Sequence, residues 1–98
     1  MRRSRVDIII DILEAAKDGA NKTSIVYKTN LNFKLADEFL NLLQKHSLLE
    51  NKLDGDKIKY ITTVKGKMFL MKTKEISLYL EIPSQTGEFW PFVSPAKS

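Results

Sequence analysis

The stretch that decides the fold spans residues 21–62 and reads NKTSIVYKTNLNFKLADEFLNLLQKHSLLENKLDGDKIKYIT. Its first part predicts a short helix over about residues 23–29, followed by a turn at residues 30–32 in which Asn32 is of a type that caps helix N-termini. The next helix carries a core-facing stripe at helical spacing, formed by Ala36, Phe39, Leu40 and Leu43. A short helix, a tight turn and a longer amphipathic helix are the parts of a helix-turn-helix.

The end of the same stretch predicts a β-hairpin. Residues 48–53 and 57–62 flank Asp54-Gly55-Asp56, and Asp-Gly is a strong hairpin signal because such turns need residues that tolerate a positive φ. Polar and apolar side chains alternate after the turn, as they do in a strand with one covered face. A hairpin that directly follows the second helix of a helix-turn-helix is the wing of a winged helix.

Upstream of this stretch, residues 4–17 predict a first helix. Ser4 is a candidate N-cap, and Asp7 stands three residues later, in the position that a capping box requires. The main core stripe of this helix is expected to consist of Val6, Ile9, Ile10, Leu13 and Ala16. A second and smaller apolar strip, Ile8 and Ile12, suggests that another helix packs there.

Downstream, residues 63–82 predict a last helix that Pro83 ends. This helix has two apolar stripes, whereas a surface helix of a monomer needs only one. One stripe follows the spacing of a coiled-coil seam, with an interruption at Glu75, and we expect it to form a dimer interface. Its members are Val64, Met68, Met71, Leu78 and Ile82. The members of the other stripe are Phe69, Ile76 and Leu80.

These elements predict an α+β fold that is mostly α, namely a winged helix-turn-helix with a C-terminal dimerisation helix. The expected domain plan places the winged helix-turn-helix in residues 1–62, the dimerisation helix in residues 63–82 and a tail in residues 83–98. A chain of this length fits one domain, and a domain this small gains stability from dimerisation.

Composition excludes several classes of protein. The net charge of +4 and the pI near 9.4 favour phosphate-rich partners. Without cysteine there is neither a disulfide nor a thiolate metal site, and one histidine cannot build a zinc site alone. No apolar run approaches the roughly 18 residues that span a membrane. The acidic residues within MRRSRVDIIIDIL argue against a signal peptide, so we expect a cytoplasmic, nucleoid-associated protein.

The sequence contains no Ser-His-Asp set, no paired carboxylates in an apolar setting and no phosphate-cradling glycine loop. We therefore expect no enzymatic activity, no cofactor, no metal and no small-molecule substrate.

Several pieces of the chain occur in the order and spacing of a known family. They are the isoleucine-rich first helix, residues 19–23, Tyr27-Lys28, residues 30–33, and Tyr60-Ile61-Thr62 with Gly66. Through these pieces the chain, from about Ser4 to Ile82, resembles the small archaeal winged-helix DNA-binding proteins, which include the ten-kilodalton coiled-coil-dimerised proteins of thermoacidophilic archaea. Two positions depart from that family, because Ser47 stands where a glycine is usual and Thr63 where an acidic residue is usual.

The resemblance implies that the last helix pairs with its copy in an antiparallel coiled coil, with the two winged helices at the ends of an elongated dimer. It also implies that the second helix of the motif faces the major groove and that the wing lies over the DNA backbone. The candidate DNA-contacting residues are Lys22, Thr23, Lys28, Asn32, Lys34, Asn41, Lys45, Lys57 and Lys59, with Lys52 as a further wing residue.

These residues have the chemistry of DNA contacts. Lysine meets phosphate or guanine, asparagine pairs with adenine edges, and backbone N–H groups at the start of a helix attract phosphate. Each position also has a simpler interpretation: a solvated helix face shared with Asp37 and Glu38, a helix cap at Thr23, or lysines that protect an edge strand of the wing.

The sequence therefore predicts double-stranded DNA binding by a homodimer, either as a sequence-specific archaeal transcription regulator or as an abundant chromatin-type protein. The alternative is a winged-helix interaction module that dimerises and recruits protein without touching DNA.

Overall fold

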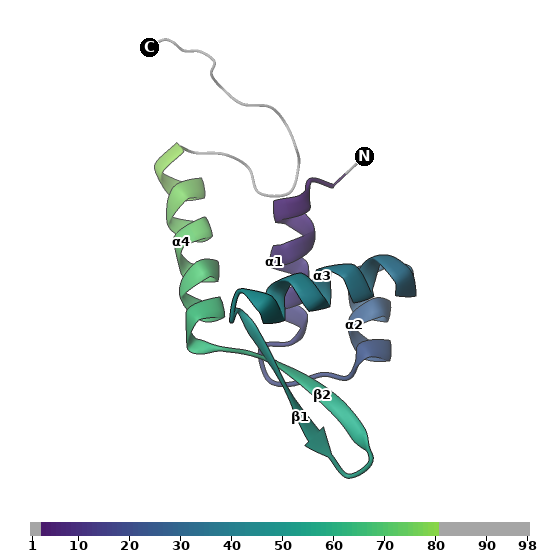
Figure 1. Ribbon diagram of the computed structural model, residues 1–98. Helices are drawn as coiled ribbons and strands as arrows, with labels where there is room; N and C mark the ends of the chain where they lie inside the picture. Colours follow the sequence, from purple (N-terminus) through teal and green to yellow (C-terminus); the bar gives the residue numbers. More distant parts are fainter. Residues whose placement is uncertain (1–2, 81–98) are drawn as a thin grey trace.

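The computed structural model describes residues 3–80 of the chain. In chain order the elements are α1 (Arg5–Ala15), α2 (Lys22–Thr29), α3 (Phe33–Lys45), β1 (Leu49–Asp54), β2 (Lys57–Thr62) and α4 (Val64–Leu80). Figure 1 shows α1, α2 and α3 grouped together, the β1–β2 hairpin projecting from that group, and α4 standing along one side of it. The element order is the one that the sequence predicts.

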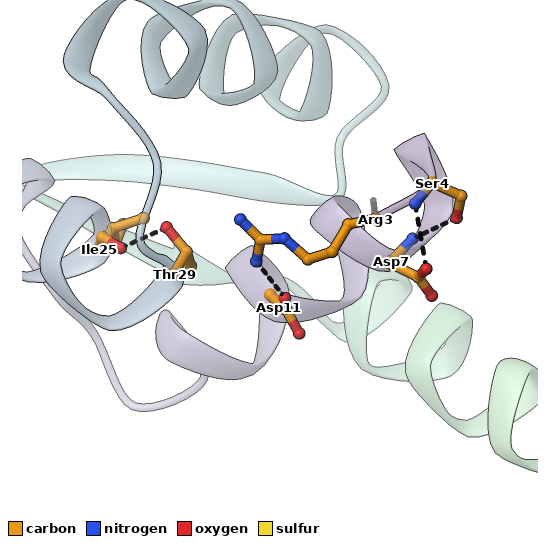
Figure 2. Close-up of polar contacts among 6 residues, drawn as sticks. All are labelled: Arg3, Ser4, Asp7, Asp11, Ile25 and Thr29. Atoms are coloured by element: carbon orange, nitrogen blue, oxygen red, sulfur yellow. Dashed lines mark hydrogen bonds and ion pairs between the residues drawn. The ribbon is translucent and has the colours of Figure 1, made fainter. Parts of the chain in front are cut away.

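α1 begins with the capping box expected from its sequence. The Ser4 hydroxyl accepts a hydrogen bond from the backbone N–H of Asp7 at 3.1 Å, and the Asp7 carboxylate accepts one from the N–H of Ser4 at 3.1 Å (Figure 2). Arg3 adds an ion pair with Asp11 at 2.7 Å. The capping box therefore provides partners for two backbone N–H groups, those of Ser4 and Asp7, at the start of the helix.

The inward side of α1 differs from the predicted stripe. Ile12, Leu13 and Ala16 are fully buried, whereas Val6 is half exposed. The prediction was wrong for Val6 and for Ile12, which belongs to the main core. The reason is tertiary: α1 contacts both α2 and α4, so its buried arc is wider than one stripe.

Asparagine side chains cap both helices of the helix-turn-helix. The Asn21 carbonyl oxygen accepts from the N–H of Ser24 at 2.8 Å, and that of Asn32 accepts from the N–H of Leu35 at 2.7 Å. The predicted cap at Asn32 is confirmed. The interpretation of Thr23 as a cap is wrong, because Asn21 holds that position and Thr23 lies inside the first turn.

The core of the motif is the predicted stripe of α3. Ala36, Phe39, Leu40 and Leu43 are all buried. They pack in one cluster with residues of the other elements, among them Ile12, Leu13, Ile25, Leu49 and Leu70. Inside α2, the buried Thr29 hydroxyl donates to the Ile25 carbonyl at 2.6 Å, which satisfies its polar atom without a partner from another element (Figure 2).

The wing is anchored at its base and open at its tip. β1 and β2 pair antiparallel from Leu49↔Thr62 to Asp54↔Lys57, and Gly55 in the two-residue loop has the positive φ of 71° that a tight hairpin requires. Thr62 is buried and its hydroxyl donates to the Leu13 carbonyl at 2.7 Å. Burial of the strand residues falls away toward the loop, so the tip projects from the core.

The two departures from the archaeal family lie together at the junction of α3, the wing and α4. Ser47 has a φ of 63°, a left-handed conformation in which glycine carries no penalty. The Thr63 hydroxyl donates to the Ser47 carbonyl at 2.6 Å and accepts from the N–H of Gly66 at 3.0 Å, so Thr63 caps α4 without an acidic side chain. A Cβ on Gly66 would meet Thr62 Cγ2 at 2.6 Å and also the Leu48 carbonyl oxygen, so this glycine allows α4 to pack against the strands.

The side of α4 that packs on the domain coincides with neither of the two predicted apolar stripes. Gly66 and Leu70 are buried, with Phe69 partly buried beside them, whereas Ile76 is more than half exposed. The apolar stripes did not single out Leu70, because the crossing of α4 over the domain, and not the apolar pattern, selects the covered side. The predictions for Ile82, Pro83, the tail and the side chain of Leu80 lie outside the described part of the structure. No helix in residues 3–80 is long and apolar enough to cross a membrane.

Candidate nucleic-acid interface

α3 presents one polar stripe away from the core. Lys34, Glu38, Asn41 and Lys45 are exposed and follow one another at steps of four, three and four residues, so they lie along one side of the helix. The buried stripe of α3 occupies the opposite side. The sequence placed Lys34, Asn41 and Lys45 off the core, and the structure puts them on this single surface, which we call the α3 outer face.

An ion pair ties the edge of this face to α2. Lys22, the first residue of α2, pairs with Asp37 of α3. The pKa of Lys22 is raised above its ordinary value, first because the Asp37 carboxylate accepts a hydrogen bond from it and second because of the charge on Asp37. Lys22 therefore stays protonated, but the Asp37 carboxylate already offsets its charge, so it offers less to an anion than a lysine without such a partner.

Phe33 is the residue of this region that sequence reasoning did not single out. It is the first residue of α3, and 53 % of its surface is exposed. The signal was present in the sequence, because Phe33 stands outside the buried stripe that begins at Ala36. The packing of α3 on the core does not cover the ring of Phe33, so the ring is exposed to solvent.

The candidates around α2 are not all brought to the α3 outer face. Thr23 is exposed in the first turn of α2. Lys28 instead lines an open recess with Asp11, Glu14 and Ala15 of α1. Two carboxylates beside Lys28 make that recess a poor place for a phosphate, since they repel the same charge that the lysine attracts.

The wing carries lysines whose charges are largely balanced. Lys59 pairs with Asp54 at 3.3 Å, and Lys52 lies directly across from Lys59 in the strand register. Lys57 is exposed opposite Asp54. The lysines of the wing thus share one face of the hairpin with acidic residues. Such a face can protect the edge of the sheet, and it can also contact phosphate.

α4 presents an apolar stripe away from the domain. Val64, Met68, Met71 and Leu78 are exposed, with 75 % of Val64 and 78 % of Leu78 accessible. These residues lie on the side of the helix opposite Gly66 and Leu70, which are buried against the domain. The members of the predicted seam that the structure describes are therefore uncovered in a single chain. We call them the α4 outer face.

Two further features bear on this site, namely metal ligation and the side chain of Asn32. Within residues 3–80, no group of three or more His, Asp or Glu side chains lies close enough together to hold a metal ion. Asn32 uses its side-chain carbonyl oxygen to cap α3, and its amide N–H groups remain to meet a ligand.

Comparison with known proteins identifies the architecture. A family model described as winged helix-turn-helix matches residues 2–81. Among solved structures, the chain is similar to Sso10a-2, a DNA-binding protein from Sulfolobus solfataricus, with a TM-score of 0.72 and 28 % identity over 81 % of this chain and 83 % of that one.

A second similar structure is BpsR from Bordetella bronchiseptica, whose DNA binding is regulated by 6-hydroxynicotinic acid. Its TM-score is 0.68 at 17 % identity, over 86 % of this chain and 63 % of that one, and a likeness at that identity shows the fold alone. No curated protein sequence matches the chain significantly. The fold class predicted from the sequence and the resemblance to the archaeal winged-helix proteins are confirmed.

Proposed function

Because the chain belongs to the winged helix-turn-helix family, we propose that it binds double-stranded DNA with α3 in the major groove. The observation that carries this proposal is the α3 outer face: an exposed polar stripe on the second helix of the motif, opposite a buried stripe that fixes its orientation. The similarity to Sso10a-2, a DNA-binding protein, supports the same proposal.

The residues of the α3 outer face have two different roles in this proposal, which are affinity for DNA and recognition of the base sequence. Lys34 and Lys45 form no ion pair within residues 3–80, so their full charge is available to phosphate or to guanine. Asn41 lies between them and has the amide that pairs with an adenine edge. Three other lysines contribute less to DNA affinity in this proposal. Lys22 and Lys59 are paired with acidic residues, and Lys52 lies opposite Lys59 in the wing.

We further propose that the protein is a homodimer through α4. The α4 outer face is apolar and uncovered, and burying each of its side chains fully contributes about 1.5–3 kcal/mol. The 17 residues of α4 span about 25 Å, which would hold two α3 helices well apart in an antiparallel pair. Glu75 lies within the face, and a lysine of the second copy, Lys72 or Lys74, would offset its charge.

The finer role follows from that assembly. Two separated winged helix-turn-helix units suit either an archaeal regulator that reads two half-sites or a chromatin-type protein that bridges duplexes, in both cases at the nucleoid. A second candidate function is a dimeric interaction module that binds no DNA. Two observations favour this alternative: the charges of the wing are largely balanced, and the α3 outer face includes Glu38 and borders Asp37, so neither surface is strongly basic.

Binding measurements on charge variants separate the two candidates. Lys34→Ala together with Lys45→Ala should weaken binding to random duplex DNA at least tenfold, measured by fluorescence anisotropy. The matched control is Lys17→Ala with Lys28→Ala, which removes the same charge from residues that lie next to the acidic side of α1. Equal affinity of both double variants and the parent chain would contradict the assignment of α3, and no binding by the parent would favour the interaction module.

A further inference from the structure

Phe33 is an exposed apolar group at the point where a recognition helix meets bases. In helix-turn-helix proteins, the N-terminal residues of the second helix contact base edges in the major groove. Phe33 is the first residue of α3, and 53 % of its surface is accessible. The aromatic ring that α3 does bury is Phe39, over which the Arg5 guanidinium lies at 5.1 Å.

The surroundings of Phe33 carry little net charge. One turn further along the same edge of α3 lies Asp37, and its carboxylate is paired with Lys22. Gln44, two turns beyond Asp37, is uncharged and partly buried. This edge therefore differs from the lysine-bearing stripe beside it: the stripe suits phosphate, while the edge suits a neutral, apolar feature of the DNA.

The major groove offers one apolar feature, which is the C5-methyl group of thymine. We propose that Phe33 recognises the 5-methyl group of thymine and so makes the protein favour thymine at the base next to the start of α3. This inference rests on the proposed function, since it needs α3 in the major groove. The inference adds an apolar residue, Phe33, and a preferred base, thymine, to a proposed interface whose other residues are polar.

No other element of the described structure buries the exposed part of the Phe33 ring. Phe33 is outside the core cluster and outside the partly buried residues packed against it. It is also on a different helix from the α4 outer face, which is where the proposed second copy would bind. A thymine methyl group would cover apolar surface that a single chain leaves to water.

The test compares thymine with deoxyuridine, which differs only by the absence of that methyl group. One mixture of random-sequence duplexes is amplified once with dTTP and once with dUTP, and the affinity of the full chain for each is measured by anisotropy. Burying one methyl group corresponds to about fourfold in affinity. The parent chain should therefore bind the thymine duplexes more tightly, by up to about fourfold for each protomer whose contacted base is thymine.

Variants assign that difference to Phe33. Phe33→Ala should bind both mixtures equally, near the affinity of the parent for the deoxyuridine duplexes, whereas Phe33→Leu should keep most of the preference. Tyr27→Ala is the matched control, since Tyr27 is an aromatic residue of α2 with 85 % of its surface exposed, and it should keep the whole preference.

The outcomes separate this inference from the proposed function. Equal binding of the parent to both mixtures, or an unchanged preference in Phe33→Ala, overturns the role of Phe33 and leaves DNA binding through the lysines intact. Absence of binding to either mixture overturns both. A preference that Phe33→Ala abolishes and Tyr27→Ala retains supports the thymine contact.

Discussion

The outer faces of α3 and α4 are made of opposite kinds of residue. Both helices bury one side in the same core, through Leu40 and Leu43 in α3 and Leu70 in α4. Away from the core, α3 shows lysine and asparagine to solvent, while α4 shows methionine, leucine and valine. Because the cost of leaving apolar surface in water is the same for both helices, the difference indicates different partners. The polar face suits DNA and the apolar face suits a second protein chain.

The largest effect is expected from charging the α4 outer face. Met71→Asp with Leu78→Asp would bury two carboxylates per protomer in the proposed seam, and should give a monomer at micromolar concentration in analytical ultracentrifugation. DNA affinity should fall about 10²-fold or more, because the second winged helix no longer binds intramolecularly.

The control for this variant makes the same chemical change elsewhere. Leu53→Asp with Ile58→Asp replaces two exposed apolar residues that face each other near the wing tip, and should leave the oligomeric state unchanged. A dimeric Met71/Leu78 variant, or a monomeric parent chain, would show that α4 is not the interface.

The next largest effect contrasts the two sides of α3. Leu40→Ala should lower the free energy of unfolding by about 2–5 kcal/mol, because it leaves a cavity in the core. Lys34→Ala should change it by less than about 0.5 kcal/mol. Urea denaturation at one fixed protein concentration measures both, and a Lys34→Ala variant as unstable as Leu40→Ala would mean that the outer face is structural.

Much of this contrast was predictable from the sequence. The stripe of α3, the Asn32 cap and the capping box at Ser4 depend on residues within a few positions of each other, so local spacing was sufficient. By contrast, the burial of Ile12 and Leu70 depends on which neighbours pack against α1 and α4, and no spacing within one helix contains that information.

The same limit applied to the site. The exposure of Lys34, Asn41 and Lys45 followed from their place off the core stripe, whereas the Lys22–Asp37 pair joins two helices and needed the fold. Lys28 was grouped with the DNA candidates for its charge, and only the packing of α2 on α1 places it beside acidic residues. Which of these residues contact DNA stays a prediction.

A smaller effect is expected at Asn41, which separates readout from affinity. Asn41→Ala should reduce discrimination at one base-pair position by about 1–3 kcal/mol if its amide pairs with an adenine. Selection of preferred duplexes from a random pool, for the parent and the variant, measures this directly. An identical preferred sequence for both would show that Asn41 lies on the face without reading a base.

The smallest effect concerns the ion pair at the edge of α3. Asp37→Ala removes the partner of Lys22 and should raise DNA affinity a few-fold, with a salt dependence steeper by about one ion for each lysine that gains a phosphate contact. Asp18→Ala is the control, because Asp18 is exposed, lies outside α3 and forms no ion pair in the described residues, so its removal takes away an equal charge and frees no lysine. Equal effects of the two variants would mean that Lys22 does not reach phosphate.

The central claim is that the α3 outer face binds the DNA backbone, and the salt dependence of affinity tests it most directly. We count Lys34 and Lys45 of that face, together with Lys57 of the wing, which forms no ion pair within the described residues. A dimer with these lysines on phosphate makes about six contacts and releases their counterions, so the logarithm of the association constant should fall with the logarithm of salt concentration at a slope of about −5. A DNA affinity that stays flat between low and physiological salt would contradict contact of this face with the DNA backbone.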